Sequence, residues 1–501
     1  MRTIFTLTRA MVASLLFPGL IASPVCHMEP TVEEATEFAL IYGYPLLSYA
    51  KFALPILQSR GTNELSHMRQ LSTAEFQDVV RPNVDTLYSW VILDLSERDL
   101  IIEVPEISDR TTGFSHSMML AKSRYGNNYA NIGSISQSSP GKYRVRYSRD
   151  REASVQLCGK ASGHDDECDD DYEGVINAPT PYGTFVGRLA VEDDMTDLEE
   201  VHALQDQMAL YSIPRKQPHP HHSNRFIPPL TIEMLNSSLS PDISLRTMQM
   251  TARFTPFSRP RIISDVRHVD DMLRHAGIHH GHYKPPTGVN LTYLAHKAGE
   301  SVRTHAALPA NTVQLGNNWS ELAPSAQGDY GTDYKMRYYV AQWGYLALVA
   351  SEALYPSYHD PLSDGGGTTL TLGAKEAYTI TFGSKPPLAA GGFWSVTAYN
   401  AEQYLVPNSL NRYALGDRSN LTYADGLPVY GSSNGSDETG FEILVQPADL
   451  QPPRNWTANW LPAPAGGGRM SITFRLYGPT QELISGQWEY PHVRKHVALS
   501  A

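Results

Sequence analysis

Cysteine is scarce in this chain, whose 501 residues contain only Cys26, Cys158 and Cys168. Three thiols are too few for a scaffold built on disulfides or for a zinc site made of cysteines, so a hydrophobic core must stabilise the fold. Charged residues make up only 18% of the chain, the net charge is −12, and no basic stripe stands out. This charge pattern argues against nucleic-acid binding, and no nucleic acid is expected as a partner.

Several catalytic motifs are missing as well. The sequence has no Gly-x-Ser-x-Gly elbow, no dinucleotide-binding glycine fingerprint, no P-loop and no His-Glu-x-x-His motif. Their absence disfavours a standard α/β-hydrolase and both nicotinamide and nucleotide chemistry. Ser48 and Lys51 match a Ser-x-x-Lys pattern, but its companion motifs are missing. We therefore expect no cofactor and predict no set of metal ligands.

The residues that are present suit a large folded protein. Hydrophobic residues make up 41% of the chain and aromatic residues 10%, which is enough for a sizeable core in two to four domains. The hydrophobic patterns predict an α+β fold in which two antiparallel β-sandwich segments are joined by a largely helical middle region. The expected divisions are a helical segment at 24–60, a first β domain at 61–195, a helical region at 196–355 and a second β-sandwich domain at 356–501.

Individual strands and helices are predicted from the spacing of apolar residues and from the turn and capping residues at the ends of each run. Strands are predicted at Thr86–Leu95, Leu100–Val104, Phe114–Leu120, Lys142–Ser148, Gly183–Val191, Tyr378–Phe382, Phe393–Tyr399, Phe441–Gln446 and Ser471–Tyr477. Helices are predicted near Leu230–Leu239, Arg261–Gly277, Tyr293–Ala307 and Lys335–Leu354. Capping boxes from Thr31 to Glu34 and from Thr196 to Glu199 predict two more helix starts, and Pro45 predicts a break in the first of these helices.

Residues 1–23 have the layout of a cleavable secretory signal. Arg2 and Arg9 precede an apolar run that closes on the small residues Ala22 and Ser23. A buried amphipathic helix is the alternative. No later stretch reaches about 18 uninterrupted apolar residues, so no membrane span is expected. Secretion also predicts N-glycosylation, and sequons are present at Asn236, Asn290, Asn318, Asn420, Asn434 and Asn455.

Three features predicted to lie in loops contain residue types that can form a disulfide or bind a metal ion. Cys158 and Cys168 are expected to form a disulfide in an oxidising compartment, which leaves Cys26 unpaired. Between and beyond them lies an acidic run of Asp165, Asp166, Glu167, Asp169, Asp170, Asp171 and Glu173. Calcium takes such oxygen ligands, but the spacing is not that of an EF-hand, so a solvated loop is favoured. The histidines His219, His221, His222, His279, His280 and His282 could ligate zinc or copper, but surface loops are favoured.

Two sets of motifs resemble known families. The segments Arg81-Pro-Asn-Val-Asp-Thr-Leu-Tyr-Ser89, Glu103-Val-Pro105, Ala178-Pro-Thr180 and Gly187-Arg188 are similar to the domain-of-unknown-function family numbered 1254. The segments Phe393-Trp-Ser-Val-Thr397, Asn411-Arg-Tyr413, Asn459-Trp-Leu-Pro-Ala-Pro464 and Arg475-Leu-Tyr477 resemble its partner family, numbered 1214. The resemblance implies tandem β-sandwiches with a helical region and, together with the signal, a secreted fungal-type member. It implies no known reaction.

The densest polar group lies at a turn-to-strand junction and contains Asn83, Asp85, Thr86 and Tyr88. Because side chains alternate along a strand, positions 85 and 88 are expected on opposite faces. Asp85 is a candidate general base, Tyr88 a candidate proton donor and Asn83 a candidate substrate ligand. The alternative is an Asx-turn, in which the carboxylate only satisfies nearby backbone amides after Pro82.

Two further groups lie in the second β domain. Arg412 offers a guanidinium able to grip a carboxylate, beside Asn411 and the phenol of Tyr413; a structural arginine between the sandwiches is the alternative. The rings of Trp394 and Trp460, with the amide of Asn459, could line a binding site for a sugar or another ring, although core packing is favoured for such residues.

These residues favour a secreted enzyme that acts on a small polar or aromatic molecule, such as a natural-product intermediate, by cofactor-free acid–base chemistry. In this hypothesis Asp85 is the base, Tyr88 and Tyr413 are acids or proton relays, and Arg412 clamps an anion. Hydrolysis, elimination and isomerisation all fit, so a hydrolase, a lyase or an isomerase is expected. The competing hypothesis is a secreted, non-catalytic carbohydrate- or ligand-binding protein.

Overall fold

The computed structural model describes residues 29–77, 80–107, 117–123, 126–136, 138–148, 152–158, 171–193, 195–215, 226–258, 260–361, 368–431 and 440–500, with the backbone alone for 117–122. Several features predicted from the sequence lie outside these residues and stay predictions. They are the signal at 1–23, Cys26, the pairing of Cys158 with Cys168, most of the acidic run, the histidines His219, His221 and His222, and the sequon at Asn434.

The first β region contains two five-stranded sheets. Its strands are β1 (Ser66–His67), β2 (Thr86–Asp94), β3 (Arg98–Val104), β4 (Ser117–Ser123), β5 (Asn128–Gly133), β6 (Gly141–Tyr147), β7 (Val155–Leu157), β8 (Gly174–Ala178), β9 (Tyr182–Ala190) and β10 (Ala209–Pro214). One sheet has the order β1-β2-β9-β4-β5 and the other the order β10-β3-β6-β8-β7. Val91 and Leu93 of β2 share a core with Leu100 and Ile102 of β3, so the two sheets form a sandwich.

The second β region is also a sandwich. Its strands are β13 (Thr312–Gly316), β14 (Trp319–Leu322), β15 (Ala353–Leu354), β16 (Ser357–Tyr358), β17 (Leu370–Leu372), β18 (Glu376–Phe382), β19 (Leu388–Asn400), β20 (Ala414–Gly416), β21 (Phe441–Pro447), β22 (Trp460–Ala463), β23 (Gly468–Pro479) and β24 (His492–Val497). An eight-stranded sheet containing β19 and β23 packs on a four-stranded sheet, β22-β21-β18-β24, around Trp394, Phe474, Phe382 and Ile443. Both regions are mainly antiparallel, and the predicted α+β class is confirmed.

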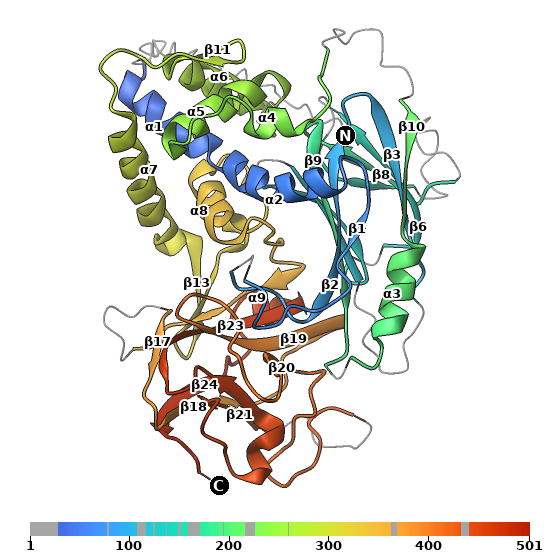
Figure 1. The fold of residues 1–501 in the computed structure, drawn as a ribbon, viewed down its shortest axis with the longest axis vertical. Coiled ribbons are helices and arrows are strands. Elements are labelled where there is room, and N and C mark those ends of the chain that lie inside the picture. The colour runs from blue at the N-terminus through green and yellow to red at the C-terminus, as the bar shows by residue number, and fades with distance from the viewer. Residues whose placement is uncertain are drawn as a thin grey trace, which may run out of the picture.

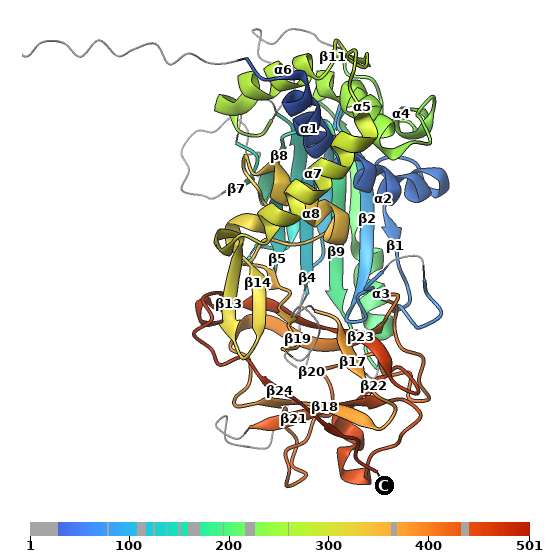
Figure 2. The ribbon, with the colours of Figure 1, turned by 90° about the vertical axis from the view of Figure 1, so that its left-hand side faces the viewer.

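Helices fill the middle of the chain and form a layer beside the first β region (Figures 1 and 2). The helices of this layer are α4 (Ile232–Asn236), α5 (Ile243–Phe254), α6 (Val266–His275), α7 (Leu291–Ala306) and α8 (Tyr334–Gly344), together with α1 (Val32–Gly43) and α2 (Pro45–Ser59) from the N-terminal part of the chain. Helices α3 (Leu198–Gln207) and α9 (Gln481–Ile484) lie outside the layer. Strands β11 (Ile278–His279) and β12 (His282–Tyr283) form a small hairpin. The capping box at Thr31 and the break at Pro45 are confirmed. The stretch Val32–Ser59 is long and apolar enough to span a membrane, but 61% of its most apolar window is buried within the fold.

Two predicted helix boundaries are wrong. Helix α8 ends at Gly344, well before Leu354, because Ala353 and Leu354 form β15 and pair with β23 instead. Glycine is a poor helix former, and the sheet buries both apolar side chains. Helix α3 begins after Asp197 rather than after Thr196; the Asp197 carboxylate accepts from the backbone N–H of Glu192 in the preceding turn and makes no cap hydrogen bond.

The two β regions meet end to face. Strands β2 and β9 run lengthwise through the upper part of the molecule, and β19 and β23 lie across their lower ends (Figure 2). Val186 and Ala190 of β9 share an apolar cluster with Phe393 of β19 and Tyr477 of β23. The outer face of the β19–β23 pair is therefore covered by the first β region.

Candidate functional site

The layer between the two β regions, which we call the seam, is rich in buried polar groups. Its buried polar members are Asp85, Arg188, Ser395, Thr397, Tyr399, Arg418, Arg475 and Tyr477, and it also contains the partly buried Asn83, Tyr88 and Tyr355 and the apolar ring of Phe393. Successive side chains along a strand point to opposite faces of the sheet, so every second residue of these strands faces the seam. In β2, Val91 and Leu93 point into the sandwich core, whereas Tyr88 points toward Phe393 and Tyr477.

The second β region contributes the face of β19 and β23 opposite to its core. Phe393 lies opposite Tyr477, Ser395 opposite Arg475 and Thr397 opposite Thr473. Each of these side chains is at most 9% exposed. The residues between them, such as Trp394 and Phe474, point into the sandwich core instead. Strands β19 and β23 are therefore buried on both faces, and the face that they turn to the seam carries polar and aromatic side chains.

Asp85 connects the two β regions. Its Oδ1 accepts from Arg418 Nη2 at 2.5 Å, and its Oδ2 accepts from Ser395 Oγ at 2.7 Å. Arg418 Nη1 also donates to the backbone carbonyls of Asp85, at 3.1 Å, and of Val191. The side chains of Asp85 and Arg418 are 1% and 2% exposed. Both carboxylate oxygens of Asp85 are therefore engaged in a buried link between distant parts of the chain.

The segment that precedes β2 is also fastened to the second β region. Asn83 donates from Nδ2 to the Tyr477 hydroxyl at 2.8 Å, while its Oδ1 accepts from the backbone N–H of Asp85 at 2.6 Å. The Tyr399 hydroxyl donates to the carbonyl of Pro82 at 2.8 Å. The Asx-turn expected as the alternative is therefore present at Asn83, whereas the Asp85 carboxylate crosses the seam.

Arg188 is the central cation of the seam. It lies directly opposite Tyr88 in the β2–β9 pairing, with its guanidinium carbon 5.2 Å from the centre of the Tyr88 ring. Burial works to lower the pKa of Arg188, but the adjacent phenols of Tyr88, Tyr355 and Tyr477 raise the pKa above its ordinary value. Arg188 is 4% exposed and stays charged.

Two of the surrounding phenols are held in their neutral form. Burial raises the pKa of Tyr477 well above its ordinary value, with Tyr355 and Tyr88 acting in the same direction. Burial likewise raises the pKa of Tyr355, although Arg188 opposes the shift. At neutral pH both phenols keep their protons, so they can donate hydrogen bonds to a bound group.

The aromatic residues chosen from the sequence are placed in cores. Trp394 is 1% exposed, packs inside the second sandwich and donates from Nε1 to the Tyr430 hydroxyl at 2.8 Å. Trp460 is 3% exposed and donates from Nε1 to the carbonyl of Gln446 at 3.1 Å. The prediction that these rings line a binding site is therefore corrected: their faces are occupied by core contacts.

The remaining predicted residues of the second β region stabilise its loops. Asn459 is buried and bonds to Thr422 and Glu442 through both ends of its amide. Arg412 donates from Nη1 to the carbonyls of Thr457, at 2.5 Å, and Trp460, at 3.0 Å. Asn411 is exposed and Tyr413 is half-buried. These contacts of Arg412 lie within the second β region, whereas the arginine that pairs between the two sandwiches is Arg418, which meets Asp85.

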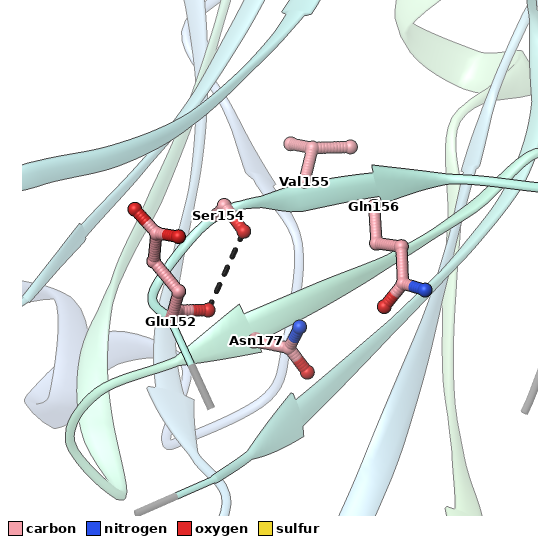
Figure 3. Close-up of a pocket in the computed structure, with 5 residues that line it drawn as sticks. All are labelled: Glu152, Ser154, Val155, Gln156 and Asn177. Carbon is pink, nitrogen blue, oxygen red and sulfur yellow. Dashed lines mark hydrogen bonds between the residues drawn. The ribbon is translucent and has the colours of Figure 1, made fainter. Parts of the chain in front are cut away.

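Two surface hollows lie away from the seam. One, of about 350 Å³, lies beside β7 and β8 and is lined by Glu152, Ser154, Val155, Gln156 and Asn177 (Figure 3). Val155 points to the other side of β7 from Gln156, and only Asn177 of the five is buried. The other, of about 250 Å³, is lined by Asn63, Glu64, Asp94, Ser96, Glu97, Arg98, Leu210, Tyr211, Ser212 and Pro229. Neither hollow contains a residue predicted for the site.

Three of the six histidines that could ligate zinc or copper belong to the described residues. The structure describes His279, His280 and His282, which lie in and around the β11–β12 hairpin. Within the described ranges, no three His, Cys, Asp or Glu side chains come together in a group that could hold a metal ion. All three histidines are exposed, as expected for residues of a surface loop.

Known proteins share the two β regions. Residues 62–212 match the family described as "Protein of unknown function (DUF1254)", and residues 352–481 match "Protein of unknown function (DUF1214)". The chain is similar to the crystal structure of the VPA0106 protein from Vibrio parahaemolyticus, with 18% identity, a TM-score of 0.58, and coverage of 93% of this chain and 99% of that one. An uncharacterized protein from Burkholderia cenocepacia gives 13% identity and a TM-score of 0.40 over 93% and 94% of the chains.

No curated protein matches the chain. At 18% identity the likeness to the Vibrio protein concerns the fold alone, and it extends over nearly the whole of both chains. The two family matches coincide with the two β regions that meet at the seam. The chain therefore combines an N-terminal DUF1254 region with a C-terminal DUF1214 region.

Proposed function

We propose that this protein is a secreted, fungal-type enzyme that acts on a small polar or aromatic molecule at the seam, by acid–base chemistry that needs no cofactor. The observation that carries the proposal is the convergence of Tyr88 and Arg188 from the DUF1254 region with Tyr355 and Tyr477 from the C-terminal half. Buried phenols beside a guanidinium form an arrangement suited to donating hydrogen bonds to a reacting group and to stabilising the negative charge that develops on it.

The roles assigned from the sequence change in this proposal. Asp85 acts as a positioning residue, because Arg418 and Ser395 occupy its two oxygens. Tyr477 and Tyr355 replace Tyr413 as donors of hydrogen bonds to the reacting group, since burial keeps both phenols neutral. Hydrolysis, elimination and isomerisation remain the reaction classes that suit such donors.

A non-catalytic ligand-binding role is the second candidate. The engagement of both Asp85 oxygens favours it, because Arg418 and Ser395 already occupy the atoms that would have to accept a proton from a substrate. The test is to incubate the purified protein with metabolite extracts of a deletion strain and to follow all small molecules by mass spectrometry. If the protein is an enzyme, the wild type should consume one metabolite of the extract and the Tyr477→Phe variant should leave that metabolite unchanged. The control variant is Tyr490→Phe, which alters a buried tyrosine of the second core and should still consume the metabolite. Retention of a metabolite without turnover would favour the binding role.

A further inference from the structure

Arg188 has hydrogen-bond donors that the described part of the chain does not satisfy. Its Nη2 donates to the carbonyl of Leu346 at 3.1 Å. Its Nε and Nη1, which together carry three N–H groups, are buried and have no hydrogen-bond partner among the described residues. An unpaired buried donor destabilises the folded state, and more so when the group is charged, so such a site is expected to hold a further acceptor.

The charge of Arg188 is also unbalanced, in contrast to two other buried arginines. Arg144 pairs with Asp99 at 2.6 Å, and Arg418 pairs with Asp85 at 2.5 Å. No carboxylate of the described residues lies within ion-pair distance of Arg188. A second cation of the seam, Arg475, acts on the same Tyr477 as Arg188 does, and Asp85 is the carboxylate that acts on Arg475. This part of the seam therefore carries an excess of positive charge, which favours a bound anion.

We propose that Arg188 anchors a binding site for a small organic carboxylate, with the rings of Tyr88, Tyr355 and Tyr477 surrounding the organic part. A carboxylate accepts hydrogen bonds from guanidinium N–H groups and from phenols, and one negative charge balances one unpaired guanidinium. Three aromatic rings suit an organic substituent better than the bare oxygens of phosphate. The inference rests on the proposed function in that it names the substrate class of the same site, but binding is testable without turnover.

Entry into this site requires the seam to open, because Arg188 is 4% exposed and Tyr477 is 1% exposed. The contacts that hold it closed include the bonds from Asn83 to Tyr477 and from Tyr399 to Pro82. Association of the carboxylate is therefore expected to be limited by the opening of the seam rather than by diffusion.

The test is calorimetric titration of the full chain with acetate and benzoate at constant ionic strength, with benzamide as the neutral analogue of benzoate and inorganic phosphate as the competing anion. Benzoate is expected to bind at least tenfold more tightly than benzamide and more tightly than phosphate. Arg188→Gln is expected to weaken benzoate binding at least tenfold, and Arg188→Lys, which keeps the charge, to weaken it less.

The matched control is Arg337→Gln, which alters another buried arginine, stacked against Tyr42 and Tyr334 in the helical layer. This variant should lose stability but bind benzoate as the wild type does. Equal binding of benzamide and benzoate, stronger binding of phosphate, no binding of either carboxylate, or unchanged affinity in Arg188→Gln would each overturn the proposal. If Arg188→Gln does not fold, Tyr477→Phe replaces it, with at least a threefold loss of benzoate affinity expected and an unchanged affinity refuting the site. Carboxylate binding without any consumed metabolite would remove the enzyme proposal and leave this site standing.

Discussion

The buried pair of Asp85 and Arg418 should stabilise the contact between the two β regions, and its disruption has a calculable cost. Asp85→Asn removes the closest charged partner of Arg418, whose side chain is 2% exposed, and leaves only the longer contact of 4.0 Å to Asp417 among the ion pairs of the described residues. Removing one partner of a buried ion pair costs about 3–5 kcal/mol, because the remaining charge stays buried. That cost is a large share of the roughly 5–15 kcal/mol by which folded domains exceed their unfolded states.

A double-mutant cycle isolates the interaction between the two side chains. Asp85→Asn and Arg418→Gln should each destabilise the protein by about 3–5 kcal/mol, and the double variant by at least about 2 kcal/mol less than their sum. Urea unfolding followed by both tryptophan fluorescence and circular dichroism measures these values. The control is the surface pair of Asp271 and Arg274, whose side chains are 40% and 56% exposed and whose coupling should stay below about 0.5 kcal/mol. A coupling at the Asp85–Arg418 pair as small as that of the control would refute the reasoning.

Three further predictions concern titration, packing and secretion. Burial raises the pKa of Glu321 and of Asp417 to about 8, so the folded state binds more protons than the unfolded state between about pH 4 and pH 8. The free energy of unfolding should therefore fall as the pH rises through this window. Urea titrations at several pH values measure this fall, and it should be smaller in the Glu321→Gln variant. Trp394→Ala should cost about 3–5 kcal/mol in the same assay by leaving a cavity in the second core, while benzoate affinity stays within twofold of wild type. The described sequons are exposed at Asn236, Asn290, Asn318, Asn420 and Asn455, so enzymatic removal of N-glycans from the secreted protein should increase its electrophoretic mobility, and an unchanged band would contradict secretion with glycosylation.

The sequence predicts the fold well where local patterns are strong. β2, β3, β9, β18, β19, β21 and β23 all lie within a few residues of their predicted positions, because alternating or continuous apolar runs bounded by turn residues are a local signal. Short strands such as β22, and the amphipathic helix α5, were not predicted. Strand β22 depends on parallel pairing with β21, which no local pattern reveals.

The candidate site is harder to predict, because choosing the wrong alternate residue transfers a role to the opposite face of a strand. The motif from Phe393 to Thr397 was recognised, but the tryptophan within it points into the core, whereas Phe393 and Ser395 face the seam. The alternation of Ser395 and Thr397 with apolar neighbours was the available signal. Arg188, Arg475 and Tyr477 also lie in the recognised motifs, although no role was assigned to them.

Partner identity across the seam could not be deduced from one sequence. Asp85 contacts Ser395 and Arg418, which are 310 and 333 residues away, and Asn83 contacts Tyr477 at a separation of 394 residues. Such pairs depend on how two sandwiches pack rather than on local propensity. Arg412 was an equally reasonable candidate until the packing placed it against the carbonyls of Thr457 and Trp460.

The account depends most on the unpaired guanidinium of Arg188, and a crystal structure of the full chain with bound benzoate tests it most directly. We expect the carboxylate oxygens at about 2.7–2.9 Å from Nε or Nη1 of Arg188, with the ring of benzoate against Tyr88, Tyr355 or Tyr477. An acidic side chain of the protein itself bonded to these nitrogens, with benzoate absent from the seam, would contradict the account.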